Sequence, residues 1–332
     1  MAYKVLIIGC GAIAGGYDAE RSPDDWPLSH AGAIARDDRF ELAACVDPDE
    51  ATRAAFAERW SVPLATPSLE SLAAEPGEFD VIVIASPTEF HLDHLEWARF
   101  LQPELVFCEK PLAASFNPVL EIRGRFEDDD ILLAVNHTRR WAPDLRELRD
   151  EVIDGEWGDL ICAIGSYSKG AVHNGSHMID LMLMMIGSLE VQAVGPAIRD
   201  HWDHDPSVSA MLIGGEWSAP VHLVAGDCRA VTQFELVMSY EQGEIAIRDG
   251  GMRIETRRVT ESSMFPGYRT LGEPDSVPGR YPEAMLCAYD NIAHALEHDV
   301  PLASTGATAF EAHAICEEIR RKALENLEKD PE

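Results

Sequence analysis

The sequence predicts an α/β protein of two domains, in which a doubly wound parallel sheet is followed by an α+β domain. Short apolar runs alternate with helical stretches over the first 136 residues, and such alternation is typical of parallel strands joined by right-handed crossovers. After Asn136 the pattern changes to strand-like runs separated by turns, which favours an antiparallel sheet. A chain of 332 residues is also too long for one hydrophobic core. We therefore expect one domain over residues 1–137 and a second over residues 138–332.

The strands of the first domain are expected where nearly all residues are apolar, because strands buried on both faces of a parallel sheet have no polar side. These runs are Val5–Ile8, Leu42–Val46, Val81–Ala85, Leu105–Cys108 and Ile131–Val135. Helices are expected between them, at Ala51–Trp60, Leu69–Ala74, Glu89–Leu101 and Pro118–Phe126.

The second domain combines a few helices with many strands. The expected helices are Pro143–Asp154, His177–Ile186, Glu283–His298 and Thr308–Asn326. The expected strands are Leu160–Ser168, Val191–Ile198, Ser207–Ile213, Pro220–Ala225, Phe234–Tyr240, Glu244–Arg248 and Met252–Thr260. The segment Pro266–Pro282 is rich in glycine and proline, and we predict that it is a long surface loop.

A glycine motif follows the first predicted strand directly, with the sequence Gly9-Cys10-Gly11-Ala12-Ile13-Ala14. In a dinucleotide-binding Rossmann domain, the first glycine permits a tight turn and the second lets the backbone approach a pyrophosphate. The small residue at the end lets a helix pack close to the sheet, and the N-terminus of that helix offers N–H donors to the phosphates. The motif therefore predicts a dinucleotide cofactor.

Asp47 ends the second predicted strand, where a carboxylate can accept hydrogen bonds from the adenosine ribose and repels a 2′-phosphate. We therefore expect NAD rather than NADP, although Arg53 is near enough in sequence to accommodate a phosphate. Asp47 is 38 residues beyond Gly9, whereas the usual interval is about 20 residues. We interpret the excess, Gly16–Leu28, as an insertion before a helix that restarts at Ser29. It either covers the cofactor or is a surface loop.

Lys110 follows the fourth predicted strand in the sequence Glu109-Lys110-Pro111. Ligands of doubly wound sheets lie beyond the carboxyl ends of the strands, so we expect this lysine near the reactive end of the cofactor. There it can hydrogen-bond a substrate hydroxyl and stabilise it as the proton leaves. The alternative is an ordinary surface lysine, which is less favoured because the chain has only five lysines.

His177 and Asp180 are three residues apart at the start of a strongly apolar predicted helix, so they share one helix face. Histidine titrates near neutral pH, which suits a base that takes a hydroxyl proton while a hydride leaves the same carbon. Asp180 would orient the ring. Taken alone, His-x-x-Asp is more often only a structural feature of a helix start.

Taken together, these motifs resemble the glucose–fructose oxidoreductase/inositol dehydrogenase (Gfo/Idh/MocA) family in order and spacing. The resemblance rests on the glycine motif, on Ala85-Ser86-Pro87-Thr88 with His91 three residues on, on Glu109-Lys110-Pro111 and on His177-x-x-Asp180. It covers the entire chain, because Arg139-Arg140-Trp141 with Pro143, and Ser304-Thr305-Gly306 before the last helix, also fit.

The resemblance implies an N-terminal Rossmann domain and a C-terminal domain with a large, mostly antiparallel open sheet that commonly forms dimers or tetramers. It implies Lys110 and His177 as the catalytic pair, assisted by Asp180. The expected cofactor contacts are Gly9, Gly11, Ala12, Ile13, Ala14, Asp47, Ser86, Pro87, Thr88, His91, Glu109 and Lys110, and the expected substrate contacts are Arg140, His173 and Asn174. For Arg139 and Arg140, structural anchoring of the interdomain helix is an alternative at least as well supported as substrate binding. His173 is a departure, because inositol dehydrogenase-like members carry Asp at that position; inositol is therefore a less secure substrate.

We accordingly expect an NAD-dependent dehydrogenase that transfers hydride between the nicotinamide and a secondary hydroxyl of a sugar, sugar derivative or cyclitol. One alternative is an NAD-retaining glycoside hydrolase, since some members of the family work in that way. Another is a non-catalytic regulator that binds NAD and a sugar, but the presence of both Lys110 and His177 argues against it. The expected assembly is a homodimer or homotetramer.

Composition excludes several other classes. The formal net charge of −31 repels phosphate backbones and anionic lipids, so neither nucleic acid nor a membrane is an expected partner. The seven cysteines are scattered and never in C-x-x-C, and no signal peptide or membrane-spanning run is seen, so we expect a cytoplasmic protein. No metal is expected, because the histidines show no ligand spacing. The run Asp200-His201-Trp202-Asp203-His204-Asp205 is predicted to be a solvated loop.

Overall fold

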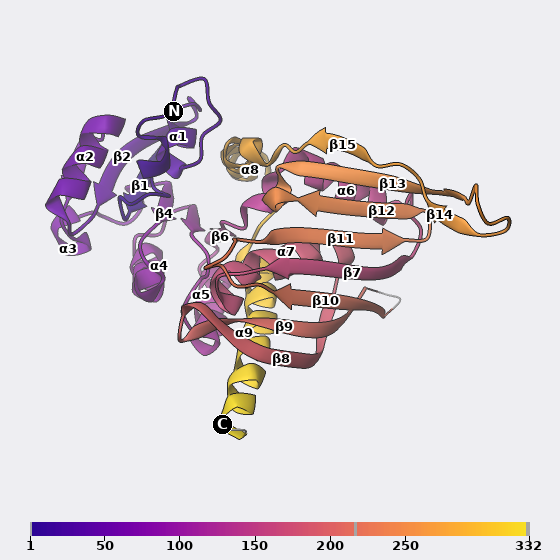
Figure 1. Ribbon diagram of the computed structural model, residues 1–332. Coiled ribbons are helices and arrows are strands. Elements are labelled where there is room, and N and C mark those ends of the chain that lie inside the picture. The colour runs from indigo at the N-terminus through magenta and orange to yellow at the C-terminus, as the bar shows by residue number, and fades with distance from the viewer. Residues whose placement is uncertain (1, 216–217, 330–332) are drawn as a thin grey trace. The chain divides into compact units, whose positions relative to one another are not determined.

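A computed structural model describes residues 2–215 and 218–329 of the chain (Figure 1). It divides into two compact units. The first unit holds the chain up to Trp141 together with Pro282–Phe310, and the second holds Ala142–Tyr281 together with the chain from Glu311 onward. Among the helices that the structure describes, none has the length and apolar character needed to span a membrane.

The first unit is built on a six-stranded sheet in which every pairing is parallel. Its order is β3-β2-β1-β4-β5-β6, which is the strand order of a Rossmann domain. The strands are β1 (Tyr3–Ile8), β2 (Phe40–Val46), β3 (Leu64–Thr66), β4 (Val81–Ile84), β5 (Leu105–Cys108) and β6 (Leu132–Val135). The predicted doubly wound sheet is confirmed. Only β3 was not predicted, because it has three residues and two of them are exposed.

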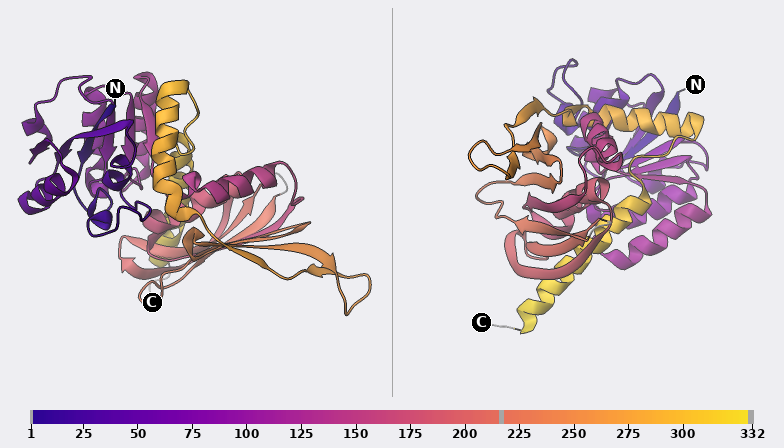
Figure 2. Two further views of the ribbon diagram at one scale, coloured as in Figure 1. Left: turned by 90° about the horizontal axis from the view of Figure 1, so that it is seen from above. Right: turned by 90° about the vertical axis from the view of Figure 1, so that its right-hand side faces the viewer.

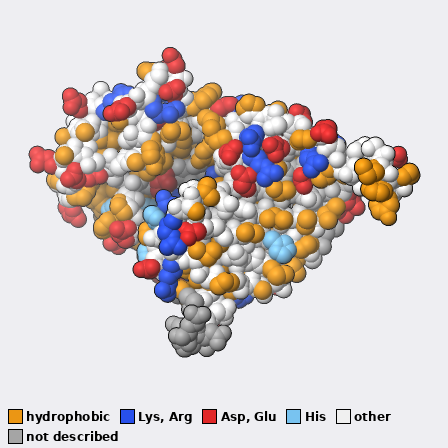
Figure 3. Space-filling view, in the orientation of Figure 1, with side chains coloured by type: hydrophobic (Ala, Val, Ile, Leu, Met, Phe, Trp, Pro, Cys, Tyr) orange, Lys and Arg blue, Asp and Glu red, His pale blue; other side chains and the backbone are white. Residues whose placement is uncertain are grey.

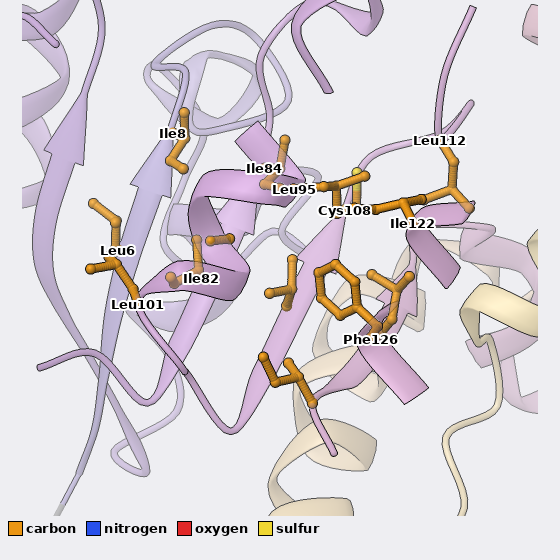
Figure 4. Packing of buried hydrophobic residues seen from close by; sticks show 14 of the residues in the cluster. Leu6, Ile8, Ile82, Ile84, Leu95, Leu101, Cys108, Leu112, Ile122 and Phe126 are labelled. Carbon is orange, nitrogen blue, oxygen red and sulfur yellow. The ribbon is translucent and has the colours of Figure 1, made fainter. Parts of the chain in front are cut away.

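Helices cover this sheet and bury its apolar side chains. They are α1 (His30–Ile34), α2 (Glu50–Trp60), α3 (Leu69–Leu72), α4 (His91–Phe100), α5 (Phe116–Asp128) and α8 (Ala284–His298), with short 3-10 turns η1 (Gly16–Asp18), η2 (Thr88–Phe90) and η3 (Thr138–Trp141). Figure 4 shows Ile82 and Ile84 of β4 in the same packed cluster as Leu95 of α4 and Phe126 of α5. Burying each such side chain stabilises the fold by about 1.5–3 kcal/mol.

A late segment of the chain returns to the first unit. The Tyr289 hydroxyl of α8 lies 3.0 Å from Nδ1 of His30, and the Trp141 indole N–H donates to Asn291 at 2.9 Å. Ser304 donates its hydroxyl to the carbonyl of Val135 at the end of β6. These buried contacts explain why the compact units differ from the predicted division at residues 137 and 138: the first unit extends to Trp141 and includes Pro282–Phe310.

The second unit contains a nine-stranded sheet in the order β14-β13-β12-β11-β7-β10-β9-β8, with β15 also paired to β13. Its strands are β7 (Leu160–Tyr167), β8 (Leu189–Trp202), β9 (Asp205–Gly214), β10 (Ala219–Ala225), β11 (Phe234–Tyr240), β12 (Gly243–Arg248), β13 (Arg253–Glu261), β14 (Arg269–Leu271) and β15 (Asp275–Pro278). Only the β7–β10 pairing is parallel. The predicted, mostly antiparallel sheet is therefore confirmed.

Helices of the second unit lie against one face of this sheet, as the edge-on view in Figure 2 shows. They are α6 (Pro143–Ile153), α7 (Gly175–Ile186) and the later part of α9 (Gly306–Lys329). Gly165 of β7 lets α7 approach closely, because a Cβ atom there would overlap Met178 and Met182. The apolar character of α7 follows from this contact, since ten of its residues are buried.

The opposite face of the sheet, which Figure 3 shows from the front, carries apolar side chains that remain exposed. Ile164 of β7, His222 of β10 and Met211 of β9 lie in one row across three neighbouring strands. Ile164 and Met211 are 46% and 52% exposed. Solvent-facing apolar side chains in register give this face the character of a surface that another protein chain could cover.

Two sequence expectations for the second unit are wrong. Pro266–Pro282 is not a loop throughout, because β14 and β15 lie within it; both strands are short and largely exposed, so they leave no hydrophobic pattern. The run from Asp200 to Asp205 is not a solvated loop. Its ends belong to β8 and β9, and Asp200 and Asp205 are buried because their carboxylates accept backbone N–H groups.

Candidate functional site

The glycine motif lies at the carboxyl end of β1, and the structure gives its two glycines different roles. Gly9 has φ +93°, and a Cβ atom on it would lie 2.7 Å from the Ser86 nitrogen and 2.8 Å from the carbonyl of Ala85. Only glycine therefore allows this turn to approach the end of β4. Gly11 has no atom within 4 Å of its Cβ position, so space is open where the backbone is expected to meet a pyrophosphate.

Backbone donors are available at this open space. Gly15 and Gly16 both donate to the Gly11 carbonyl at 3.2 Å, closing a single turn. Within the part of the chain that the structure describes, the N–H groups of Gly11, Ala12 and Ile13 donate to no acceptor. Successive unsatisfied N–H groups form a binding site for an anionic group. A helix was expected directly after the motif. The structure has only the turn closed on Gly11 and the short η1 there, because the insertion begins at Gly16.

The insertion is fastened to the start of α1. Asp18 is 5% exposed, and its carboxylate accepts hydrogen bonds from the backbone of Leu28 at 3.0 Å and from the Ser29 backbone at 2.8 Å. Ser29 in turn caps α1 by accepting from the nitrogen of Gly32. The predicted helix restart at Ser29 is therefore confirmed, whereas a covering role of residues 16–28 over the cofactor stays a prediction.

A pocket of about 400 Å³ lies at the carboxyl ends of β1, β2 and β4. Its lining residues are Ile8, Gly9, Val46, Asp47, Pro48, Pro67, Ser68, Leu69, Glu70, Ser86, Pro87, Phe90 and His94. Four of the predicted cofactor contacts, Gly9, Asp47, Ser86 and Pro87, are brought together here. Its position matches that of cofactors in doubly wound sheets, and its size suits a small ligand or part of a larger one.

Asp47 is held in place at this pocket. Its Oδ2 accepts from the Cys10 nitrogen at 2.8 Å, and its Oδ1 accepts from the Asp49 nitrogen at 2.9 Å. The Arg53 guanidinium donates to the Asp47 carbonyl at 2.6 Å. The carboxylate is therefore oriented by backbone donors from two sides, while Arg53 is occupied with the main chain.

Two pocket residues, Phe90 and His94, were missed from the sequence. Their rings stack with centroids 6.1 Å apart, and Nδ1 of His94 lies 2.8 Å from the Ser86 hydroxyl. Burial lowers the pKa of His94, so its ring is neutral around neutral pH. Sequence reasoning missed them because an aromatic residue and a histidine four positions apart are ordinary on a helix face.

His91 and Thr88 do not line the pocket. Thr88 begins η2 after Pro87. His91 is 1% exposed, and its two ring nitrogens lie 2.8 Å from the Ser86 carbonyl and 2.9 Å from the Pro111 carbonyl. His91 thereby connects the turn after β4 to the turn after β5, a linking role that the sequence did not reveal. Cofactor contact by either residue stays a prediction.

Glu109 is buried at the end of β5 in a hydrogen-bonded network. Its Oε1 accepts from Asn136 at 2.6 Å and lies 3.1 Å from Nε2 of His30, which also contacts Tyr289. Burial raises the pKa of Glu109, but the hydrogen bonds from His30 and Asn136 and the charge of Lys110 outweigh burial and leave the pKa below its usual value. Glu109 therefore stays ionised and fixes the backbone beside Lys110, a half-buried residue that begins a cis peptide bond to Pro111.

His137 lies in the same region, directly after Asn136. Burial, with the charges of Arg140 and Lys110, lowers the pKa of this histidine to about 3. It is therefore neutral at any working pH. Arg140 is half-buried in η3, and Arg139 beside it is buried. Neither arginine lines the pocket at the carboxyl ends of β1, β2 and β4.

The remaining predicted residues belong to the second unit. His177 is half-buried in the first turn of α7, and Asp180 is buried one turn later. The preceding turn, η4 (Gly170–Asn174), is a π-helix. In it, Nδ1 of His173 lies 2.7 Å from Oδ2 of Asp205, and the Asn174 amide donates to the Ser168 carbonyl at 2.8 Å.

The candidate catalytic pair is therefore divided between units, with Lys110 in the first and His177 in the second. Their joint action stays a prediction. No group of three or more His, Cys, Asp or Glu side chains suited to a metal ion is found in residues 2–215 and 218–329.

Comparison with known proteins places the chain in a family. Residues 3–137 match the family described as "Oxidoreductase family, NAD-binding Rossmann fold". The chain is 25% identical to inositol 2-dehydrogenase of Rhizobium meliloti (strain 1021) over 321 residues, which are 89% of this chain and 93% of that protein. It is 31% identical to D-xylose 1-dehydrogenase (NADP(+)) 2 of Haloferax volcanii over 237 residues, or 69% of this chain and 66% of the relative.

Solved structures with the same fold cover nearly the whole chain. An NAD binding oxidoreductase from Klebsiella pneumoniae has a TM-score of 0.80 at 14% identity, with 98% of this chain and 97% of that chain covered. An oxidoreductase from Agrobacterium radiobacter in complex with NAD+, L-tartaric acid and magnesium has a TM-score of 0.77 at 16% identity, with 98% and 97% covered. Together with the Rossmann strand order and the glycine turn, these matches show that the protein belongs to the Gfo/Idh/MocA family of NAD(P)-dependent oxidoreductases.

Proposed function

We propose that the protein transfers a hydride between NAD and a secondary hydroxyl of a sugar, a sugar derivative or a cyclitol. The observation that carries this proposal is the buried Glu109 network, which directly precedes Lys110 at the end of β5 in the unit that also holds the open glycine turn. The names of the relatives, an inositol dehydrogenase and a xylose dehydrogenase, support this substrate class.

The residues of the first unit fit a dinucleotide. The N–H groups of Gly11, Ala12 and Ile13 would bind the pyrophosphate, and the oriented carboxylate of Asp47 would accept the ribose hydroxyls. Because a carboxylate repels a 2′-phosphate, NAD is favoured over NADP. The Haloferax relative is named for NADP, so cofactor preference is a property to measure for this chain.

When bound, the nicotinamide accepts or returns the hydride. Lys110 would donate a hydrogen bond to the substrate oxygen and stabilise negative charge on it. His177 would take the proton of the same hydroxyl, and the buried Asp180, one helical turn further on, would fix its orientation. Arg140, His173 and Asn174 are the proposed substrate contacts.

We further propose that the protein is a homodimer or homotetramer, assembled through the open face of its second sheet. The exposed row of Ile164, His222 and Met211 supports this proposal. Replacing Met211 by Lys would place a charge at the centre of such an interface. The expected result is a smaller species in light scattering, whereas an unchanged mass would remove this face as the interface.

The proposed activity is tested by near-ultraviolet absorbance of the protein with NAD and pooled sugars, sugar acids and cyclitols. Growth of the reduced-nicotinamide band with one pool supports a dehydrogenase. A glycoside hydrolase that retains its cofactor would release sugar without accumulating that band, and a regulator would bind NAD without turnover. Binding of NAD with neither product in any pool would contradict the proposal.

A further inference from the structure

The end of β8 presents a compact group of aromatic and basic side chains around one indole. The Trp202 ring stacks on the ring of His173 with centroids 4.1 Å apart and an interplanar angle of 25°. His201 meets the same indole edge-on at 4.1 Å, and the Lys169 ammonium lies 5.8 Å from its centroid. His204 is 6.2 Å from His173. We call these five residues the Trp202 cluster.

The cluster is rigidly supported by two buried carboxylates. Asp205 accepts hydrogen bonds from the backbone of Val172 at 3.0 Å and of His173 at 2.9 Å, in addition to the His173 ring. Asp200 accepts from the backbone of Lys169 at 2.6 Å and from the Ser207 hydroxyl at 3.0 Å. An ionised carboxylate only accepts, so Nδ1 of His173 is the donor to Asp205. The carboxylates of Asp200 and Asp205 are thus buried and accept hydrogen bonds from backbone, hydroxyl and ring donors.

The side chains that face solvent are basic. Lys169, His201 and His204 are exposed, and none has an ion-pair partner among the residues that the structure describes. Arg199 is exposed on the same strand, and Asp203 is the exposed acid of the turn. In the orientation of Figure 3, Lys and Arg side chains and histidines gather over this end of β8, β9 and β10. In a chain with 58 acids and 27 bases, such a concentration of unpaired basic groups is unusual.

The Trp202 cluster lies next to the proposed proton acceptor in the same unit. His173 belongs to η4, which leads directly into α7, and His177 follows four residues later in the first turn of that helix. Only one turn of helical backbone therefore separates the cluster from His177. A substrate whose hydroxyl is near His177 would therefore bring its other substituents within reach of the cluster.

We propose that the Trp202 cluster binds an anionic substituent of the substrate, so that the protein prefers a sugar acid or a sugar phosphate to the neutral parent sugar. This inference rests on the proposed function. Lys169 supplies a charge-assisted hydrogen bond, and His201 and His204 supply further N–H donors. Trp202 contacts both the His173 ring and the Lys169 ammonium, so it holds these side chains together in one group.

The proposal is tested with matched pairs of probes, D-gluconate and D-galacturonate against D-glucose and D-galactose, with D-glucose 6-phosphate as a third anion. Binding is measured by calorimetry on the NAD-loaded protein, and turnover by reduced-nicotinamide absorbance. Lys169→Gln should weaken binding of the preferred anion by at least about tenfold, because it removes a charge-assisted hydrogen bond to the anion. Binding of the neutral partner should stay within about twofold, the scatter of an ordinary surface substitution.

Lys4→Gln is the control, since it removes the same charge from an exposed position on β1 of the first unit. It should leave both affinities unchanged. A second variant, His201→Gln with His204→Gln, should lower the preference for the anion further without altering the thermal unfolding temperature, because both rings are exposed.

An anion preference that Lys169→Gln reduces would support the proposal, and comparing the two carboxylates with the phosphate distinguishes a carboxylate site from a phosphate site. Equal binding of acidic and neutral sugars by the wild type, or a preference for the anion that Lys169→Gln does not reduce, would overturn it. Anion binding at the cluster without any turnover would contradict the proposed dehydrogenase but leave the anion site supported, so the two failures are distinguishable.

Discussion

Replacement of Asp205 by Asn tests whether the β8–β9 turn is a buried anchor of the second unit. Asp205 has no exposed surface. Its carboxylate accepts the backbone N–H groups of Val172 and His173 and the His173 ring, at 3.0, 2.9 and 2.7 Å. The Asn side chain has one acceptor oxygen, and its NH2 group would face N–H donors. Some of the N–H groups of Val172 and His173 would therefore lose their acceptor.

The expected loss can be worked from these contacts. The hydrogen bonds from the His173 backbone and the His173 ring both end on Oδ2. A hydrogen bond to a charged group contributes about 1.5–3 kcal/mol, so losing both costs at least about 3 kcal/mol of unfolding free energy. Burial raises the pKa of Asp205, but the hydrogen bonds from His173 and Val172 outweigh it and leave the pKa below its usual value. The stabilisation is therefore fully present above the unfolded pKa of about 4 and is lost as pH falls through the folded value.

The assay is urea unfolding at neutral pH, followed by circular dichroism, with Asp203→Asn as the matched control. Asp203 lies two residues away in the same turn but is exposed, so its replacement should change stability by less than about 0.5 kcal/mol. A loss below about 1 kcal/mol in Asp205→Asn, or an equal loss in both variants, would refute the assignment of Asp205 as a buried anchor.

Three further outcomes are expected. Gly9→Ala should lower the unfolding temperature and abolish NAD binding, because its Cβ would lie 2.7 Å from the Ser86 nitrogen. Gly11→Ala has open space at its Cβ, so this variant should unfold at the wild-type temperature and lose only its NAD affinity, measured by calorimetry. Asp47→Asn should raise kcat/KM with NADP relative to NAD by about tenfold, or about 1.4 kcal/mol, because the repulsion of the 2′-phosphate is removed. The wild-type free energy of unfolding should fall as pH drops below about 6.5, the pKa of His137 in the unfolded state. The folded pKa of His137 is about 3, so between these two pH values only the unfolded state binds the extra proton. Urea unfolding at several pH values in this range should give a dependence of unfolding free energy on pH that is smaller by roughly 1 kcal/mol per pH unit in His137→Gln.

Each of these outcomes has a contradicting result. Equal unfolding temperatures for the two glycine variants would mean that Gly9 is not confined by the Ser86 turn. An unchanged ratio of NADP to NAD activity in Asp47→Asn would mean that this carboxylate does not contact the ribose. Parallel acid titrations of the wild type and His137→Gln would mean that His137 is protonated in the folded protein.

Much of the fold could be predicted because the hydrophobic pattern of the sequence matches the burial of the residues in the structure. The strands β5 and β11 begin and end at the predicted residues. β5 is an apolar run buried on both faces, and β11 alternates buried and partly exposed residues, so each carries a clear strand pattern. The short strands β3 and β15 could not be predicted, because most or all of their residues are exposed and backbone pairing alone holds them. The return of α8 to the first unit depends on tertiary contacts such as Tyr289 with His30, which no local pattern encodes.

The candidate site was predictable where one residue type is required by local geometry. Gly9 is such a case, because its positive φ and its approach to Ser86 exclude a side chain. The partners of predicted residues were not predictable: His30 reaches Glu109 from 79 positions earlier in the chain, and Asp205 reaches His173 from 32 positions later. Long-range hydrogen bonds of this kind leave no periodic signal in a single sequence.

The central claim is that Lys110 and His177 act on one substrate hydroxyl while NAD takes the hydride. The most direct measurement is the rate of reduced-nicotinamide accumulation by the wild type, Lys110→Ala and His177→Gln, with the NAD dissociation constant measured for each. We expect accumulation beyond one equivalent of enzyme in the wild type, and a loss of about 10²–10⁴-fold in each variant with NAD binding retained. Activity near the wild-type level in either variant, with NAD still bound, would contradict the assignment of that residue to the reaction.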